Sequence, residues 1–217
     1  MTTFEQWTEW NGRHNCLPYM ETFPLAETRA PSWAKLWEEA GEAAVLLESG
    51  KDGRYTFVGA EPAEWISGGL EGGARVRAGG GPPEPAAGAP LEALRRWMGE
   101  FSAPRPPGMP KFAGGIAGYL AYDVARTLER LPERAAADSP VPDYFFARLE
   151  KLWVVDHERS LLQCIVHAVR PRGEAPWGEK ELRARYAGAQ AEARRMKEAW
   201  ERWMRAEPER FAGTGEG

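Results

Sequence analysis

Glycine inside an apolar stretch is the feature that most constrains this chain. The stretch runs from Lys111 to Pro132 and reads KFAGGIAGYLAYDVARTLERLP. Its glycines are Gly114, Gly115 and Gly118. The segment 115–122 carries strand-forming residues and predicts a buried β-strand. Because glycine in a strand costs conformational entropy, these positions indicate a bulge or a close approach of another backbone segment. From Asp123 the apolar period becomes helical, so we expect Asp123 to cap a short helix that ends at Pro132.

Short elements are predicted before this stretch. Ser32 is expected to cap a helix over 33–40, and a hairpin is expected from strands at 44–49 and 54–59, with Tyr55 and Phe57 on one face. Short strands follow between 63 and 78. The low-complexity segment 79–90 is typical of a flexible surface connection. An amphipathic helix is then predicted from the spacing of apolar residues at Leu91, Leu94, Met98 and Phe101.

Strong strand patterns and a long helix follow it. The runs 143–156 and 160–169 predict a long antiparallel hairpin. A helix is predicted over 179–207, with apolar residues at alternating steps of four and three. This apolar side either docks on the chain's own sheet, which we favour, or provides a surface for a partner. The sequence thus predicts an α+β fold, an antiparallel β-sandwich-like domain with flanking helices and a long C-terminal helix.

Composition argues against several classes of protein. The formal net charge of -4 disfavours a nucleic-acid-binding protein, which usually carries a basic patch. No apolar run is long enough to span a bilayer, and the N-terminus lacks the apolar core of a secretory signal. We therefore expect a soluble, cytoplasmic protein without a membrane partner. Cys16 and Cys164 are unclustered, which fits a reducing compartment and predicts neither a disulfide scaffold nor a metal site.

Catalytic motifs are missing from the sequence. The histidines are isolated, and no HExxH, CxxC or Gly-x-Ser-x-Gly pattern occurs. The glycines at 114–118 lack the Lys-Ser/Thr of a phosphate-binding loop, so we do not expect a nucleotide site. Asp123, Arg126 and Glu129 form a charged triplet at helical spacing. We interpret Asp123 as a cap and the other two as a surface pair, without a catalytic role.

Two long motifs carry a resemblance to a known family. Residues 112–132 match F-x-G-G-x-x-G-Y-x-x-Y-D-x-x-R-x-x-E-x-L-P, and Leu-Leu-Glu-Ser at 46–49 is followed by Gly-Arg-Tyr-Thr-Phe-Val-Gly at 53–59 and by Pro62. In this order they resemble the component I family of anthranilate and aminodeoxychorismate synthases. The resemblance covers roughly 44–169 and extends only to the N-terminal half of that family. It implies a component I N-terminal domain over 1–172 and a charged helical tail over 173–217 that leads toward a missing chorismate-binding domain.

The resemblance implies a function in chorismate metabolism. The leading interpretation is the regulatory or structural N-terminal module of aminodeoxychorismate synthase component I, in para-aminobenzoate and folate biosynthesis. The short turn between Ser49 and Arg54 favours this branch. One alternative is the corresponding module of anthranilate synthase component I, which serves tryptophan biosynthesis and carries the feedback site. Another is a stand-alone, non-catalytic module that binds tryptophan or a protein partner.

The family's chemistry implies partners outside this chain. In the family, ammonia from a glutamine amidotransferase subunit is added to chorismate bound with Mg²⁺. The residues that hold chorismate and Mg²⁺ belong to the C-terminal half. We therefore expect no catalytic residue, no metal and no cofactor in this chain, with Mg²⁺ in the missing catalytic half. The expected partners are the glutamine amidotransferase subunit and a chorismate-binding catalytic domain, and the chain alone is expected to be inactive.

A ligand site is implied at Ser49, Arg54 and Tyr55. In the family, the matching strand end and strand start help to form a pocket for L-tryptophan. Exposed carbonyls and a hydroxyl suit an α-ammonium group, and an aromatic wall suits an indole. The structural alternative is that Ser49 ends a strand, Arg54 pairs with Glu48 and Tyr55 belongs to the core. The family's pocket is completed by an Asn-Pro-Ser-Pro-Tyr segment that this sequence lacks, so we expect weak binding.

Overall fold

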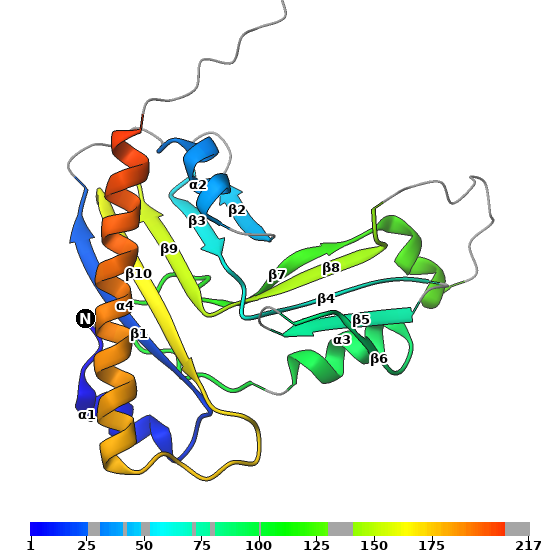
Figure 1. Ribbon diagram of the computed structural model, residues 1–217, viewed down its shortest axis with the longest axis horizontal. Coiled ribbons are helices and arrows are strands. Elements are labelled where there is room, and N and C mark those ends of the chain that lie inside the picture. The colour runs from blue at the N-terminus through cyan, green and yellow to red at the C-terminus, as the bar shows by residue number, and fades with distance from the viewer. Residues whose placement is uncertain are drawn as a thin grey trace, which may run out of the picture.

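Two antiparallel sheets make up the framework of the molecule. The structure, a computed structural model, describes residues 1–25, 31–40, 43–48, 53–70, 73–78, 81–99, 101–129 and 141–206. Within these residues the strands form two five-stranded sheets, and Figure 1 shows one of them extending sideways from the other. Helices lie against both sheets. The predicted α+β class, with flanking helices and a long C-terminal helix, is confirmed.

Each sheet combines strands that are distant in the sequence. Sheet A has the order β1 (Cys16–Pro24), β10 (Leu161–Val169), β9 (Lys151–Asp156), β3 (Tyr55–Ala60) and β2 (Ala44–Glu48). Sheet B has the order β6 (Glu84–Ala86), β5 (Gly73–Ala78), β4 (Glu64–Gly69), β8 (Tyr144–Leu149) and β7 (Gly115–Leu120). The helices are α1 (Phe4–Asn11), α2 (Trp33–Glu39), α3 (Pro90–Met98), the 3₁₀ helix η1 (Tyr122–Thr127) and α4 (Glu179–Arg205). The predicted hairpin of β2 and β3 and the predicted helix α2 are present.

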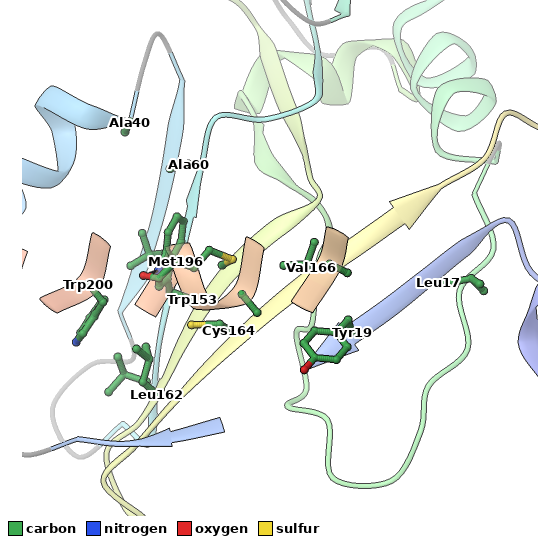
Figure 2. Packing of buried hydrophobic residues seen from close by; sticks show 14 of the residues in the cluster. Leu17, Tyr19, Ala40, Ala60, Trp153, Leu162, Cys164, Val166, Met196 and Trp200 are labelled. Carbon is green, nitrogen blue, oxygen red and sulfur yellow. Dashed lines mark hydrogen bonds between the residues drawn. The ribbon is translucent and has the colours of Figure 1, made fainter. Parts of the chain in front are cut away.

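The long helix α4 lies across one face of sheet A (Figure 1). Its buried side chains are Leu182, Ala189, Ala193, Met196, Trp200 and Trp203. Figure 2 shows Met196 and Trp200 close to side chains of sheet A, including Trp153 and Leu162. The indole Nε1 of Trp153 donates a hydrogen bond to the carbonyl of Met196 at 2.8 Å. The apolar side of this helix therefore docks on the chain's own sheet, as we favoured.

Capping residues define the short helices at the N-terminal side. Thr3 and Gln6 form a capping box at α1, because the side chain of each accepts a hydrogen bond from the backbone of the other. Ser32 Oγ accepts from the backbone of Lys35 at 3.3 Å and so caps α2 as predicted. The indole of Trp7 donates to the carbonyl of Pro18 in β1 at 2.9 Å. Pro18 is tolerated there because β1 is an edge strand.

A single residue connects the two sheets between β8 and β9. The run 143–156 was predicted as one strand of a long hairpin, but it forms two strands in different sheets, with Glu150 between them. Only β9 pairs with β10. An inter-sheet core fills the angle between the sheets, and its buried residues are Met20, Ala117, Ala147, Leu149, Leu152, Val154 and Ile165. Sheet B is thus held against the face of sheet A that α4 does not cover.

The motif strand β7 is an edge strand, and the prediction that it is buried was wrong. It pairs only with β8 among the described strands, and most of its residues are exposed or half-buried. The predicted helix after it is a 3₁₀ helix whose cap position is Ala121, so Asp123 is not the cap. Asp123 instead pairs with Arg126, with Nε and Oδ1 2.7 Å apart. We expected Arg126 to pair with Glu129, and the structure pairs it with Asp123.

The segment 79–90 and the helix after it also differ in detail from the prediction. The expected flexible connection contains β6, which pairs with β5. Helix α3 ends at Met98, and its buried residues are Ala93, Leu94 and Trp97. Met98 is largely exposed, and Phe101 lies beyond the helix. The predicted Leu94 is buried and Leu91 packs against the same core, so the sequence spacing located this helix and was wrong only at Met98 and Phe101.

Candidate functional site

Arg54 lies at one end of sheet A, immediately before β3, and two carboxylates hold it there. The register of β3 and β9 places Tyr55 opposite Asp156. The Nε and Nη2 atoms of Arg54 donate to Oδ1 and Oδ2 of Asp156 at 3.1 and 2.7 Å. Its Nη1 atom lies 2.8 Å from Oε2 of Glu158. Because a bidentate pair fixes the plane of the guanidinium as well as its charge, Arg54 has one defined orientation.

Asp156 is the buried partner in this pair. Its side chain is 3% exposed, whereas that of Arg54 is 36% exposed. Burial by itself would raise the pKa of Asp156, but hydrogen bonds from Arg54 and from the backbone N–H of Arg159 outweigh burial and lower the pKa. Asp156 is therefore ionised at neutral pH and anchors this end of the sheet.

Neighbouring polar groups close the end of the sheet around this pair. The backbone N–H of His157 donates to the carbonyl of Arg54 at 2.9 Å. The Oγ1 atom of Thr56 and the Nε2 atom of His157 lie 2.8 Å apart. These bonds connect the start of β3 to the turn after β9, so the backbone around Arg54 is fixed from both sides.

Aromatic rings form a wall behind Arg54. The guanidinium carbon of Arg54 lies 4.9 Å from the centre of the Tyr55 ring. Tyr55 contacts Phe57, with ring centres 5.6 Å apart, and Phe57 meets Phe112 edge to face at 5.7 Å. All of these rings pack against the inter-sheet core. A flat apolar ligand placed against this wall would have a cation and two carboxylates close by.

The structure brings two of the three predicted site residues together. Arg54 and Tyr55 are in contact, while Ser49 lies outside the described residues. Arg54 pairs with Asp156 and Glu158, so the structural alternative named the wrong carboxylate in Glu48. Tyr55 does pack against the core, as that alternative held. The sequence signal for Asp156 was a polar turn between two apolar runs, and it gave no reason to connect that turn with Arg54.

The described residues do not form a metal-binding cluster, and their cysteines are not paired. Among the described residues, no group of three or more His, Cys, Asp or Glu side chains is arranged to hold a metal ion. In the same part of the chain, no helix is both long enough and apolar enough to cross a membrane. Cys16 and Cys164 are both buried and both free. Burial raises the pKa of the Cys16 thiol to about 12, so it is protonated at neutral pH.

Comparison with known proteins identifies relatives. No family model matches the chain. Anthranilate synthase component 1 of Mycobacterium tuberculosis is 35% identical over 136 residues, which cover 59% of this chain and 26% of that protein. The Thermus thermophilus protein of the same name is 32% identical over 188 residues, covering 81% of this chain and 38% of that protein. Aminodeoxychorismate synthase component 1 of Bacillus subtilis is 32% identical over 123 residues, covering 57% of this chain and 26% of that protein.

The chain is related to the component I synthases. It spans about a quarter to two fifths of the length of these curated relatives. Among solved structures, anthranilate synthase component I from Streptococcus pneumoniae superposes with a TM-score of 0.43 at 19% identity, over 80% of this chain and 37% of that chain.

The glycines of the component I motif have steric reasons for being glycine. A Cβ atom on Gly118 would lie 1.9 Å from the carbonyl oxygen of Phe145 in the neighbouring strand β8. Gly114 has φ +119°, and a Cβ there would lie 2.4 Å from Nε2 of His167. The predicted close approach of another backbone segment is thus confirmed at Gly118. At Gly114 the close neighbour is a side chain of sheet A.

Proposed function

We propose that this chain is a non-catalytic module of a chorismate-utilising component I synthase and that the Arg54 end of sheet A binds L-tryptophan. The observation that carries the ligand proposal is the fixed Arg54 beside the aromatic wall of Tyr55 and Phe57. The relatives support the family-level part, since their names cover both the anthranilate and the aminodeoxychorismate branch. The short sequence spacing between Ser49 and Arg54 supports the aminodeoxychorismate branch.

Charge balance assigns Arg54 a positioning role in this proposal. Two carboxylates already neutralise its guanidinium, so it is a poor receptor for the ligand's carboxylate. It fixes the start of β3 and keeps the Tyr55 ring in place. The α-ammonium of tryptophan is received by backbone carbonyls and the Ser49 hydroxyl, and the indole packs on the aromatic wall.

Calorimetric titration of L-tryptophan into the full chain tests the ligand proposal. We expect weak, saturable binding that is lost in Ser49→Ala and reduced in Arg54→Gln, because the latter loosens the wall. Glu9→Gln, an exposed change on α1, is the matched control and should bind like the parent. Absence of saturable binding, or equal binding by Ser49→Ala and the parent, would contradict a tryptophan site here.

An activity assay tests the non-catalytic part separately. The purified chain is supplied with chorismate, Mg²⁺ and ammonium ions, and products are separated by chromatography. We expect neither anthranilate nor aminodeoxychorismate, since the proposal places chorismate and Mg²⁺ in a separate catalytic domain that works with a glutamine amidotransferase. Turnover by this chain would overturn the proposal, and the product formed would identify the branch.

One observation favours a second candidate, a stand-alone module that binds tryptophan without any catalytic partner. Helix α4 completes the core of sheet A with the chain's own residues. A chain of this kind does not need another subunit to cover that face. Tryptophan binding with unchanged affinity in the presence of the glutamine amidotransferase and the catalytic domain would support this candidate.

A further inference from the structure

A pocket of about 330 Å³ lies between the two sheets, at the opposite end of sheet A from Arg54. The register shows the separation: Cys16 pairs with Val169 at this end, whereas Leu161 pairs with Asp156 at the other. The larger apolar side chains that line the pocket are Met98, Phe101, Phe112, Ile116, Leu149 and Val169. Its volume is at the lower end of the roughly 300–1,000 Å³ usual for small-molecule sites, so it suits about one aromatic ring with a short chain.

Cys16, Gly114 and His167 form an uncharged, hydrogen-bonded part of the pocket wall. Nε2 of His167 donates to the carbonyl of Ala113 at 2.6 Å, which leaves Nδ1 to accept from the Cys16 thiol 3.3 Å away. Burial lowers the pKa of His167, so the imidazole is neutral near pH 7. Gly114 lets the loop sit directly on this ring. Neither Cys16 nor His167 therefore carries a charge that could neutralise a charged ligand.

Charge in the pocket wall comes from Arg148 and Glu150. Arg148 lies 3.4 Å from Glu64 and 3.1 Å from Glu150, and its guanidinium carbon lies 4.2 Å from the centre of the Phe101 ring. One guanidinium thus faces two carboxylates, which leaves a net negative charge. Burial and the charge of Glu64 raise the pKa of Glu150, although Arg148 and Lys151 oppose the change. A second cation beside Glu150 would offset this cost.

We propose that this pocket binds a small organic ammonium compound with an apolar body, whose charged head pairs with Glu150. The body of such a ligand, about one aromatic ring in size, packs against Phe101, Phe112 and Ile116. Glu150 supplies the negative charge because Lys151, its neighbour in the chain, already pairs with Glu61 and Glu192. The charged groups of the pocket lie at the opposite end of the sheet from Arg54, and Phe112 is the ring that both sites contact.

Three phenyl compounds of similar size and different charge test the proposal. Phenethylamine, 2-phenylethanol and 3-phenylpropionate are titrated separately into the full chain, and binding is followed by calorimetry and by methyl shifts of Ile116, Leu149 and Val169. We expect the amine to bind about tenfold more tightly than the alcohol, because its head makes a charged hydrogen bond. The carboxylate should bind most weakly. Equal affinity for the three probes, or no saturable binding of the amine, would overturn the proposal.

Two pocket variants and one control variant separate the contribution of the ligand's charged head from that of its apolar body. Glu150→Gln should lower the affinity for phenethylamine about tenfold and remove the preference over the alcohol. Glu9→Gln removes an exposed carboxylate on α1 and should change nothing. Ala103→Phe changes an exposed residue at the pocket and should exclude the amine and the alcohol by filling the space. Ala103→Phe still tests the proposal if the Glu150→Gln variant does not fold. Unchanged affinity for phenethylamine in Glu150→Gln, or retained binding of the amine and the alcohol in Ala103→Phe, counts against the proposal.

Discussion

Asp156 shows how much of this structure depends on single long-range pairs. It is almost fully buried, and its partner Arg54 is 102 residues away in the sequence. Periodicity in the sequence indicates which residues share a face, and it contains no information on which charges meet across such a distance. The sequence therefore located Arg54 and Tyr55 at a strand start, but Asp156 and Glu158 were visible only in the fold.

Replacing Asp156 with Asn should destabilise the fold in a pH-dependent way. The folded-state pKa of Asp156 is lowered below its ordinary value, so its contribution is present at neutral pH and is lost as the pH falls below about 3.8. Arg54 is partly exposed, so we expect a loss of about 1–2 kcal/mol in the free energy of unfolding at pH 7.

Urea denaturation of the parent and the Asp156→Asn variant at pH 7 and at pH 3 measures this effect. The difference between the two proteins should shrink at the lower pH. Asp123→Asn, which alters an exposed pair on η1, is the matched control and should lie within about 0.5 kcal/mol of the parent at both values. A difference for Asp156→Asn that stays constant from pH 7 to pH 3 would argue against this linkage.

At the scale of elements, α4 was the easiest to predict because its signal is local. Its apolar spacing extends over the whole helix, and the buried residues are those expected from it. The run 143–156 is the opposite case. Both halves have strand character, and no Gly or Pro marks the change of sheet at Glu150. The edge position of β7 was missed for a related reason, because strand order is decided by pairing between distant segments.

Two substitutions in α4 should change stability in opposite directions. Gly188 lies in the helix with open space around its Cβ position, so Gly188→Ala should stabilise the protein by about 0.5–1 kcal/mol. Ala193 is fully buried against sheet A, so Ala193→Leu should destabilise it by about 1–3 kcal/mol through overpacking. Thermal unfolding followed by circular dichroism measures both effects. Equal effects of the two changes would show that α4 does not pack on sheet A as described.

At the scale of the whole molecule, the two sheets should unfold together. The chain passes directly from β8 to β9 through Glu150, and Leu149 of sheet B is buried in the inter-sheet core. A Cβ on Gly59 in sheet A would lie 2.5 Å from Leu149, which shows how closely the sheets approach. Opening one sheet would therefore expose apolar surface of the other.

Native-state hydrogen exchange measures this coupling. The most protected amides of β8 and β9 should give opening free energies that agree within about 1 kcal/mol, as for one cooperative unit. If the opening free energy of β8 is lower than that of β9 by more than about 2 kcal/mol, sheet B unfolds independently.

The one-residue corner at Glu150 also determines where this chain tolerates changes in length. Since side chains alternate between the two faces of a strand, one inserted residue at the corner would turn every side chain of β9 to the wrong face. Val154 would then leave the inter-sheet core, and Trp153 would leave the core beneath α4. The connection between β6 and α3 has no such constraint, because it joins an edge strand to a helix at the surface. Insertions and deletions are therefore expected at that connection and should be excluded from the corner.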